Sequence, residues 1–184
     1  MARKKKIDIE DIKANEDAGK ISCILTIENS ALVDYKMENL KKLADLDVKV
    51  MSLTWNDPNC FGQCNSENRE LMKLPLTDFG KEAIPVMNDL GIVVDVSHLN
   101  EGGFYDVAKY TKKPFLATHS NAYTLCRHSR NLTDARLRRL SALDGIVGVN
   151  LYVHFLSETD DCGMDDVLRH IEYLAEVAGE DHVA

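Results

Sequence analysis

Glu28, His98 and His119 have side chains that could together hold a catalytic metal ion. Each follows an apolar run within two positions, where a parallel strand would end. One carboxylate and two imidazoles are suitable protein ligands for a catalytic zinc site, which keeps a further position open for water. Taken singly, each residue has an ordinary alternative: a solvated acid for Glu28 and a loop histidine for the other two.

Five apolar runs alternate with stretches that have helical spacing. The strands are predicted at residues 21–27, 48–53, 92–96, 114–118 and 146–151. The helices are predicted at 7–18, 35–46, 77–90, 104–111, 133–143 and 164–179, with a polar loop at 56–73. Thr77 is a favourable N-cap and Gly91 a favourable helix end. Strands that alternate with helices are typical of a parallel sheet, whose carboxyl edge carries the active site in a barrel.

Two α/β folds fit this pattern, a doubly wound sheet and a (β/α)8 barrel. No Gly-x-Gly-x-x-Gly element follows the first strand, which weakens the dinucleotide-binding interpretation. A barrel needs eight strands in about 250 residues. The sequence therefore predicts a partial (β/α)8 TIM-type barrel of about five βα units, with residues 1–184 as a single incomplete domain. Residues 181–184 are predicted to start another strand.

The charge of the chain argues against nucleic acid as a partner. Its 30 acidic and 22 basic residues give a formal net charge of −8, whereas phosphate binding needs clustered Lys and Arg. The basic run Arg3–Lys6 is expected to be a solvated helix start. The acidic pairs Asp160–Asp161 and Asp165–Asp166 are expected to cap a helix, because the helix dipole favours acids at its N-terminus.

Membrane association and export are not predicted either. No apolar run approaches the about 20 residues that cross a bilayer, and no apolar stretch follows the charged start. The five cysteines are an odd number without regular spacing, so reduced thiols and a cytoplasmic location are expected. Cys60 and Cys64 are interpreted as part of a plain loop, because no second pair completes a zinc site.

Arg130 stands in a loop just before a predicted helix start, where a guanidinium could bind a carboxylate with two hydrogen bonds. Its alternative is a loop arginine paired with a surface acid. His128 and His154 lie in predicted loops and could touch a substrate. His170, inside a predicted helix with acidic neighbours, is expected to be a surface residue.

Five sequence elements in fixed order carry a resemblance to a known family. They are LTDFGKE (76–82), LGIVVDVSH (90–98), THSNA (118–122), SRNLTD (129–134) and GIVGVN (145–150). In order and spacing they resemble the membrane (renal) dipeptidase family of zinc-dependent hydrolases. Weaker similarity extends upstream through Glu28 and residues 52–56, so the resemblance covers nearly the whole chain after the first twenty residues.

The resemblance implies a (β/α)8 barrel that holds two zinc ions and hydrolyses dipeptides with zinc-activated water. Glu28 matches the carboxylate that bridges the two metals, and His98 and His119 match the two imidazoles of one metal. Arg130 matches the arginine that binds the substrate's carboxylate. No residue of this chain is assigned to general acid–base catalysis.

Three departures from the family pattern limit what the chain is expected to do alone. No His-x-Asp pair precedes His98, the Asp-rich strand of the family is absent, and Trp55 stands where well-known members carry a histidine. We therefore expect at most one zinc ion and little or no peptidase activity from this chain. Its unpaired sheet edges predict a homodimer or a completing chain.

Two other functions stay open. One is a non-catalytic partial-barrel remnant that acts only as a folding or binding module. The other is a different metal-dependent hydrolase of the amidohydrolase type, although the His-x-His strand end usual in that group is absent.

Overall fold

The computed structural model describes residues 9–159 and 161–184. The expected helix start at Arg3–Lys6 and the expected capping acid Asp160 lie outside these residues. The described part contains one parallel sheet of five strands, β1 (Leu25–Ile27), β2 (Val48–Ser52), β3 (Val93–Asp95), β4 (Leu116–Ala117) and β5 (Ile146–Val147).

The order of the strands distinguishes the two folds that the sequence allowed. Each strand pairs with the next one along the chain, in the order β1-β2-β3-β4-β5. A doubly wound sheet reverses its strand order near the middle, whereas a (β/α)8 barrel winds in one direction only. The sheet is therefore an arc with the winding of a barrel.

Six longer helices lie close to their predicted positions: α1 (Ile9–Asp17), α2 (Met37–Asp45), α4 (Asp78–Leu90), α5 (Glu101–Tyr110), α6 (Asp134–Ser141) and α8 (Met164–Ala178). Thr77 caps α4 by accepting a hydrogen bond from Gly80 N, and Gly91 ends it in the left-handed conformation, both as predicted. Four short helical turns were not predicted: η1 (Ser30–Val33), α3 (Arg69–Met72), α7 (Val153–Leu156) and η2 (Glu180–His182).

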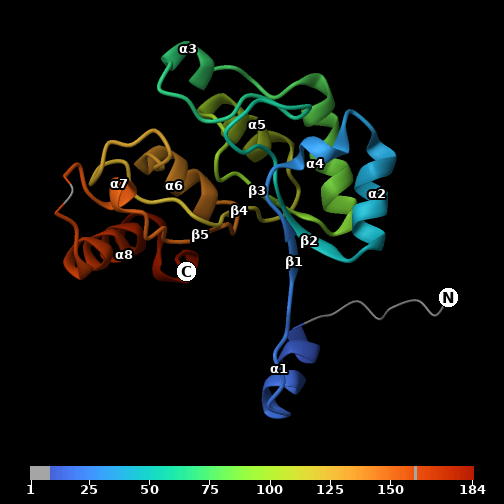
Figure 1. Cartoon of the computed structure of the whole chain (residues 1–184), viewed down its shortest axis with the longest axis horizontal. Helices are drawn as coiled ribbons and strands as arrows, with labels where there is room; N and C mark the ends of the chain where they lie inside the picture. Colours follow the sequence, from blue (N-terminus) through green and yellow to red (C-terminus); the bar gives the residue numbers. More distant parts are fainter. Residues whose placement is uncertain (1–8, 160) are drawn as a thin grey trace.

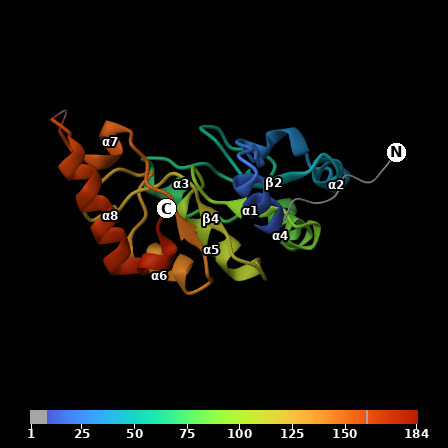
Figure 2. The ribbon, with the colours of Figure 1, turned by 90° about the horizontal axis from the view of Figure 1, so that it is seen from below.

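The helices lie along the outside of the strand arc. In Figure 1, α2 and α4 lie on one side of the strands and α6 and α8 on the other, while α1 stands apart below β1. Seen from below in Figure 2, α2 and α4 are again separated from α6 and α8. None of the residues of α1 is buried, so this helix contributes no side chain to the core.

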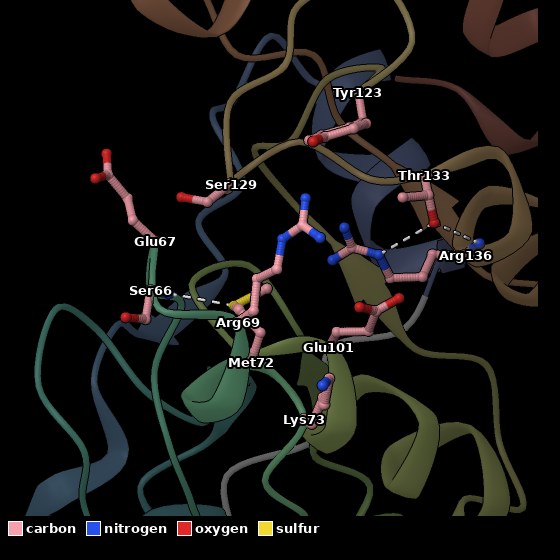
Figure 3. A pocket seen from close by; sticks show the side chains of 10 residues that line it. All are labelled: Ser66, Glu67, Arg69, Met72, Lys73, Glu101, Tyr123, Ser129, Thr133 and Arg136. Carbon is pink, nitrogen blue, oxygen red and sulfur yellow. Dashed lines mark hydrogen bonds between the residues drawn. The ribbon is translucent and has the colours of Figure 1, made fainter.

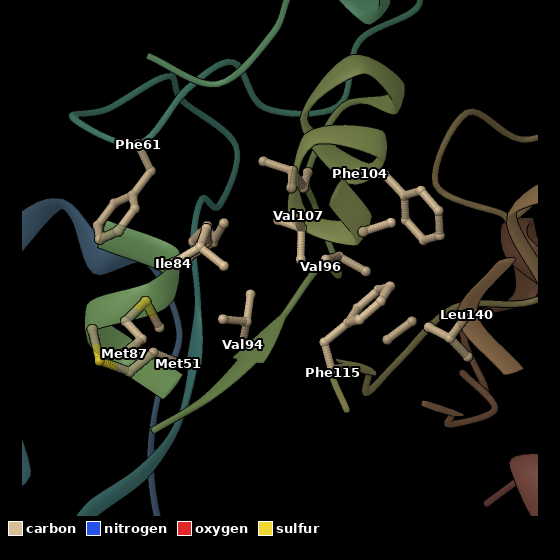
Figure 4. Close-up of a cluster of buried hydrophobic side chains, with 14 of the residues drawn as sticks. Met51, Phe61, Ile84, Met87, Val94, Val96, Phe104, Val107, Phe115 and Leu140 are labelled. Carbon is tan, nitrogen blue, oxygen red and sulfur yellow. The ribbon is translucent and has the colours of Figure 1, made fainter. Parts of the chain in front are cut away.

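The two faces of the sheet differ in burial. Register partners Met51 and Val94 point toward the helices and are fully buried, as are Ala117 and Val147. Figure 4 shows Met51 and Val94 in the core with side chains from α4, α5 and α6. On the opposite face Val50, Val93 and Leu116 are only partly buried, and Ile146 is exposed. This second face, called here the open face, would line the inside of a complete barrel.

The segment 56–73 is more ordered than the polar loop that was predicted. It buries Phe61 completely and contains α3. Asn100 explains this order, because its amide nitrogen donates to the carbonyl oxygens of Leu71 (2.8 Å) and Leu74 (2.7 Å). The side-chain oxygen of Asn100, Oδ1, accepts a hydrogen bond from Gly103 N and so caps α5. This helix therefore begins at Glu101, three residues before its predicted start.

The strands at both ends of the arc are shorter than predicted. Of the run 21–27, only Leu25–Ile27 forms a strand, and Ile21 and Ile24 are exposed. At the other end, Val183 forms a parallel bridge with Val147. The hydrogen bonds from Ala184 N to Val147 O (2.9 Å) and from Val149 N to Ala184 O (2.8 Å) extend this pairing. Of the predicted strand start at 181–184, residues 183–184 are thus paired to β5, whereas residues 181–182 belong to η2.

Candidate metal centre

The three side chains expected to be metal ligands meet at the carboxyl edge of the sheet. Glu28 Oε1 lies 3.2 Å from His98 Nε2 and 3.4 Å from His119 Nε2. Their potential ligand atoms all lie within 4.8 Å of one another, close enough to coordinate one ion. No other group of three His, Cys, Asp or Glu side chains comes together in this way within residues 9–159 and 161–184.

The ends of three different strands position these side chains. Glu28 directly follows β1, His98 lies three residues beyond β3, and His119 lies two residues beyond β4. His98 has a φ of 70°, a left-handed conformation that is uncommon for a bulky residue. Such backbone strain is found at functional sites that the surrounding fold holds in place.

A hydrogen-bonded chain orients the His119 ring. Thr118 Oγ1 lies 2.8 Å from His119 Nδ1 and 2.7 Å from Asp95 Oδ2. Since an ionised carboxylate can only accept, the Thr118 hydroxyl donates to Asp95 and accepts from the Nδ1–H of His119. The proton is thus on Nδ1, and the lone pair of Nε2 faces Glu28. Metal-bound histidines are typically fixed in this way by a hydrogen bond to the other ring nitrogen.

Asp95 holds this arrangement in place through hydrogen bonds. Its buried carboxylate accepts hydrogen bonds from Ser52 Oγ (2.6 Å), Ser97 N (3.0 Å), Thr118 N (3.0 Å) and Thr118 Oγ1 (2.7 Å). These donors come from β2 and from the ends of β3 and β4. Asp95 therefore ties three strand ends together beneath the metal cluster.

The His98 ring is oriented by a different group. Its Nδ1 lies 3.2 Å from Asn56 Oδ1, an acceptor, so Nδ1 carries the proton here too. The backbone nearby is also held, because Asn65 N donates to His98 O over 2.6 Å. Both imidazoles consequently present an unprotonated Nε2 toward Glu28.

The electrostatic environment keeps both imidazoles neutral. Burial lowers the pKa of His98 to about 3, with further lowering by the nearby charge of Arg130. Burial is also the main cause of the lowered pKa of His119, followed by Arg130. A neutral imidazole is the form that coordinates metal, so these two side chains are available as ligands at physiological pH.

Arg130 is a buried cation close to this cluster. Its guanidinium lies over the Phe155 ring, 5.3 Å from the ring centre, and it makes no ion pair among the described residues. Burial lowers its pKa to about 10, while Asp95 and Glu28 act in the opposite direction. The alternative of a loop arginine paired with a surface acid is wrong for the described part of the chain. An uncompensated buried cation suits an anionic ligand.

The remaining histidines and Trp55 have other surroundings. Trp55 is partly exposed, with its ring centre 6.4 Å from that of His98. His128 accepts a hydrogen bond from Arg130 N (3.1 Å) and packs on Phe155, so it supports the arginine loop. His154 is exposed.

The predicted surface position of His170 is wrong. Its side chain is fully buried, with Nδ1 accepting from Ala122 N (3.1 Å) and Nε2 lying 3.1 Å from Leu156 O. His170 shares a helix face with Leu174 and Ala178, which are also buried. In the sequence, the i, i+4 spacing of His170 to these apolar residues indicated a buried position, and this spacing is a stronger signal than the acidic residues next to it. The expected capping role of Asp166 is confirmed, since Oδ2 accepts from Gly163 N (2.9 Å).

The donor set fits zinc. A carboxylate and two neutral imidazoles are ligands that zinc accepts, and they leave room for water in a fourth position. Within residues 9–159 and 161–184, no second group of three His, Cys, Asp or Glu side chains is found that could hold another ion. Among the described residues, no helix is both long and apolar enough to pass through a membrane.

Comparisons with known proteins agree with this geometry. A family described as "Membrane dipeptidase (Peptidase family M19)" matches residues 5–184. A Klebsiella pneumoniae protein, described only as uncharacterized, is 35% identical over 183 residues, covering 95% of this chain and 67% of the relative. An uncharacterized dipeptidase of Schizosaccharomyces pombe is 37% identical over 175 residues, covering 94% of this chain and 42% of the relative.

Solved structures give the same result at the level of the fold. A metallo peptidase from Rhodobacter sphaeroides, liganded with a phosphinate mimic of the dipeptide L-Ala-D-Ala, superposes with a TM-score of 0.87. It is 31% identical, and the match covers 95% of this chain and 52% of that structure. The chain spans about half the length of the solved metallopeptidases that it matches.

Proposed function

The chain belongs to the membrane dipeptidase family, peptidase family M19, and on that premise we propose that it supplies one zinc-binding half of a metallodipeptidase centre. The family is metal-dependent, and the five-stranded arc corresponds to about half of its barrel. The observation that carries the proposal is the convergence of Glu28, His98 and His119, with both histidine Nδ1 atoms engaged elsewhere.

The proposed substrate is a dipeptide. A bound zinc ion would activate water for attack on the peptide carbonyl. Arg130 would bind the substrate's terminal carboxylate, because its guanidinium is buried and lacks a carboxylate partner among the described residues. The dipeptide mimic in the Rhodobacter sphaeroides relative supports this substrate class. Recognition of a free carboxylate near the metal would limit the substrate to a short peptide.

We expect this chain to hold at most one zinc ion and to be a weak peptidase, or an inactive one, by itself. His98 and His119 serve one ion, whereas a second ion would keep only the shared Glu28. Trp55 can donate one hydrogen bond through its indole N–H but cannot act as an acid.

The open face supports the proposal of a second copy or a completing chain as partner. Val50, Val93 and Leu116 are partly exposed there, and Ile146 is exposed. Apolar side chains on an uncovered face favour association, because burial of each removes apolar surface from water. The cytoplasmic location and the single incomplete domain stay predictions.

The alternative function is a partial barrel that binds metal without hydrolysis. The tryptophan at position 55 and the missing second set of ligands favour it for the chain taken alone.

Zinc stoichiometry and turnover measured together test the proposal. The metal-free chain is loaded with zinc and incubated with an L,L dipeptide, an L,D dipeptide and the corresponding dipeptide amides. We expect one zinc per chain, lost in His119→Ala, and slow zinc-dependent release of amino acids from the free dipeptides but not from the amides. Zinc binding with no detectable release would favour the alternative, and two tightly held zinc ions would contradict the ligand count.

A further inference from the structure

A pocket of about 400 Å³ is lined by none of the proposed metal ligands. Its walls come from α3, from the start of α5 and from residues 123–136, as Figure 3 shows. We call it the arginine pocket, after Arg69 and Arg136. In Figure 3 both guanidinium groups point into the same space, with the hydroxyl groups of Tyr123 and Ser129 on its far side.

Arg136 is buried without a negatively charged partner among the described residues. Only 4% of its surface is exposed. Its Nη2 donates to the carbonyl oxygen of Asn131 (2.9 Å), and its Nε donates to the Thr133 hydroxyl (3.4 Å). Both acceptors are neutral. Burial lowers the pKa of Arg136, and the more distant Glu101 offsets this only in part. A buried cation of this kind is costly unless an anion lies near it.

Arg69 brings a second positive charge to the same space. It lies in the first turn of α3 and makes no ion pair or hydrogen bond in which its guanidinium takes part within the described residues. The nearby Lys73 ammonium, by contrast, is already bound by Glu70 (2.8 Å).

The acids at the pocket limit the charge that it can accept. Glu101 extends its carboxylate toward Arg136 in Figure 3, whereas the Glu67 carboxylate points away from both guanidinium groups. The two positive guanidinium groups and the one carboxylate that faces them leave a net charge of about +1 in the pocket. A single negative charge would balance it, and a second would be repelled by Glu101.

We propose that the arginine pocket binds a small organic monocarboxylate between Arg69 and Arg136. A planar carboxylate matches the fork of a guanidinium and can accept two hydrogen bonds from it. The pocket's volume accommodates a ligand body beyond the carboxylate, near the Tyr123 and Ser129 hydroxyls and the side chain of Met72. This proposal does not depend on the dipeptidase proposal, because the two sites share no side chain.

Calorimetric titration of the metal-free 184-residue chain tests the proposal. Removing metal excludes coordination of the probe by zinc, and variants of Arg69 and Arg136 distinguish the arginine pocket from Arg130. The probes are propionate, inorganic phosphate and propylammonium, which separate a monocarboxylate from a polyanion and from a cation. We expect saturable binding of propionate alone. Arg69→Gln should weaken it about tenfold, consistent with the loss of charge-assisted hydrogen bonds, and Arg136→Gln should weaken it at least as much.

Two further variants sharpen the test. Arg138 is an exposed arginine in the same helix as Arg136 and pairs with Asp134 (3.9 Å). The Arg138→Gln variant should therefore bind propionate like the native chain. Glu101→Gln removes the repelling acid and should tighten propionate binding several-fold. Because Arg69 is exposed, its variant is expected to fold even if Arg136→Gln does not. Absence of saturable propionate binding, tighter binding of phosphate or propylammonium, or unchanged binding in Arg69→Gln would overturn the proposal.

Discussion

The middle of the strand arc and its β1 edge contribute to the same metal cluster but are built differently. β3 and β4 each have a neighbouring strand on both sides, and Asp95 ties their ends together through four hydrogen bonds. β1 pairs on one side only, and Leu25 within it is more than half exposed. His98 and His119 belong to the middle, whereas Glu28, whose side chain is 52% exposed, belongs to the edge.

This difference indicates that the two kinds of ligand are not equally preorganised. The imidazoles are held by neighbours on their second ring nitrogens, while the described hydrogen bonds of the Glu28 carboxylate include none from a backbone N–H. A ligand that is fixed before metal binding loses less conformational freedom when the metal binds. We therefore expect the middle of the arc to determine most of the zinc affinity.

The largest expected effect comes from removal of an imidazole. His98→Ala or His119→Ala should lower zinc affinity by more than the roughly 10- to 100-fold cost of losing an outer-shell partner. Glu28→Gln should cost less than either. Competition against a chromophoric chelator measures all three, with the exposed His154→Ala as control. Equal losses in Glu28→Gln and His119→Ala would remove the distinction between middle and edge.

A glycine beside His119 should give the next largest effect. A Cβ atom at Gly148 would lie 2.2 Å from the carbonyl oxygen of Thr118, so Gly148→Ala must displace the end of β4. We expect a loss of about 1–3 kcal/mol in the free energy of unfolding, measured by urea denaturation, together with weaker zinc binding. Gly163→Ala is the matched control, because nothing lies within 4 Å of its added Cβ. Equal stability of the two variants would contradict this account.

Thr118→Val tests the hydrogen-bonded chain behind His119 with a change of nearly the same shape. Without the hydroxyl, His119 Nδ1 loses its acceptor and Asp95 loses one donor. We expect zinc affinity to fall about tenfold, at the low end for an outer-shell partner. Thr124→Val, which removes a hydroxyl bonded to Asp134 (2.9 Å), should leave the affinity unchanged. A similar loss of zinc affinity in both variants would show that the hydrogen bonds from Asp95 through Thr118 to His119 do not matter for metal binding.

The smallest effect on stability is expected at the β1 edge. Leu25→Lys replaces an exposed apolar side chain, so the free energy of unfolding should change by less than about 0.5 kcal/mol. Self-association should decrease, because a lysine on an edge strand disfavours pairing with another strand. Thermal unfolding and sedimentation velocity measure the two quantities. Strong destabilisation would mean that β1 is more tightly packed than its exposure indicates.

The same contrast explains which features were predictable from sequence. Parallel strands place their carboxyl ends at one edge, so three strand-end residues could be brought together from spacing alone: Glu28, His98 and His119. Their residue types at these positions suggested a metal site, the family resemblance gave each its role, and both assignments stay predictions. Thr77 and Gly91 could be read as helix ends because capping depends on local sequence.

Other features depend on residues far apart in the chain and were missed for that reason. The spacing of His170 to Leu174 and Ala178 indicated a buried helix face, but the groups that satisfy its ring nitrogens, Ala122 N and Leu156 O, lie 48 and 14 residues away and could not be inferred. The order in segment 56–73 depends on Asn100. The role of Thr118 could not be inferred before Asp95 was seen to approach it across the β3–β4 pair.

The bridge between Val147 and Val183 has a consequence for any engineered extension of the sheet. Its hydrogen bonds already align residues 183–184 with β5. This alignment determines which of any added residues would point to the core face of the sheet and which to the open face. A segment spliced after Ala184 would start from this template, and an insertion of one residue directly after Ala184 would exchange its inward and outward side chains.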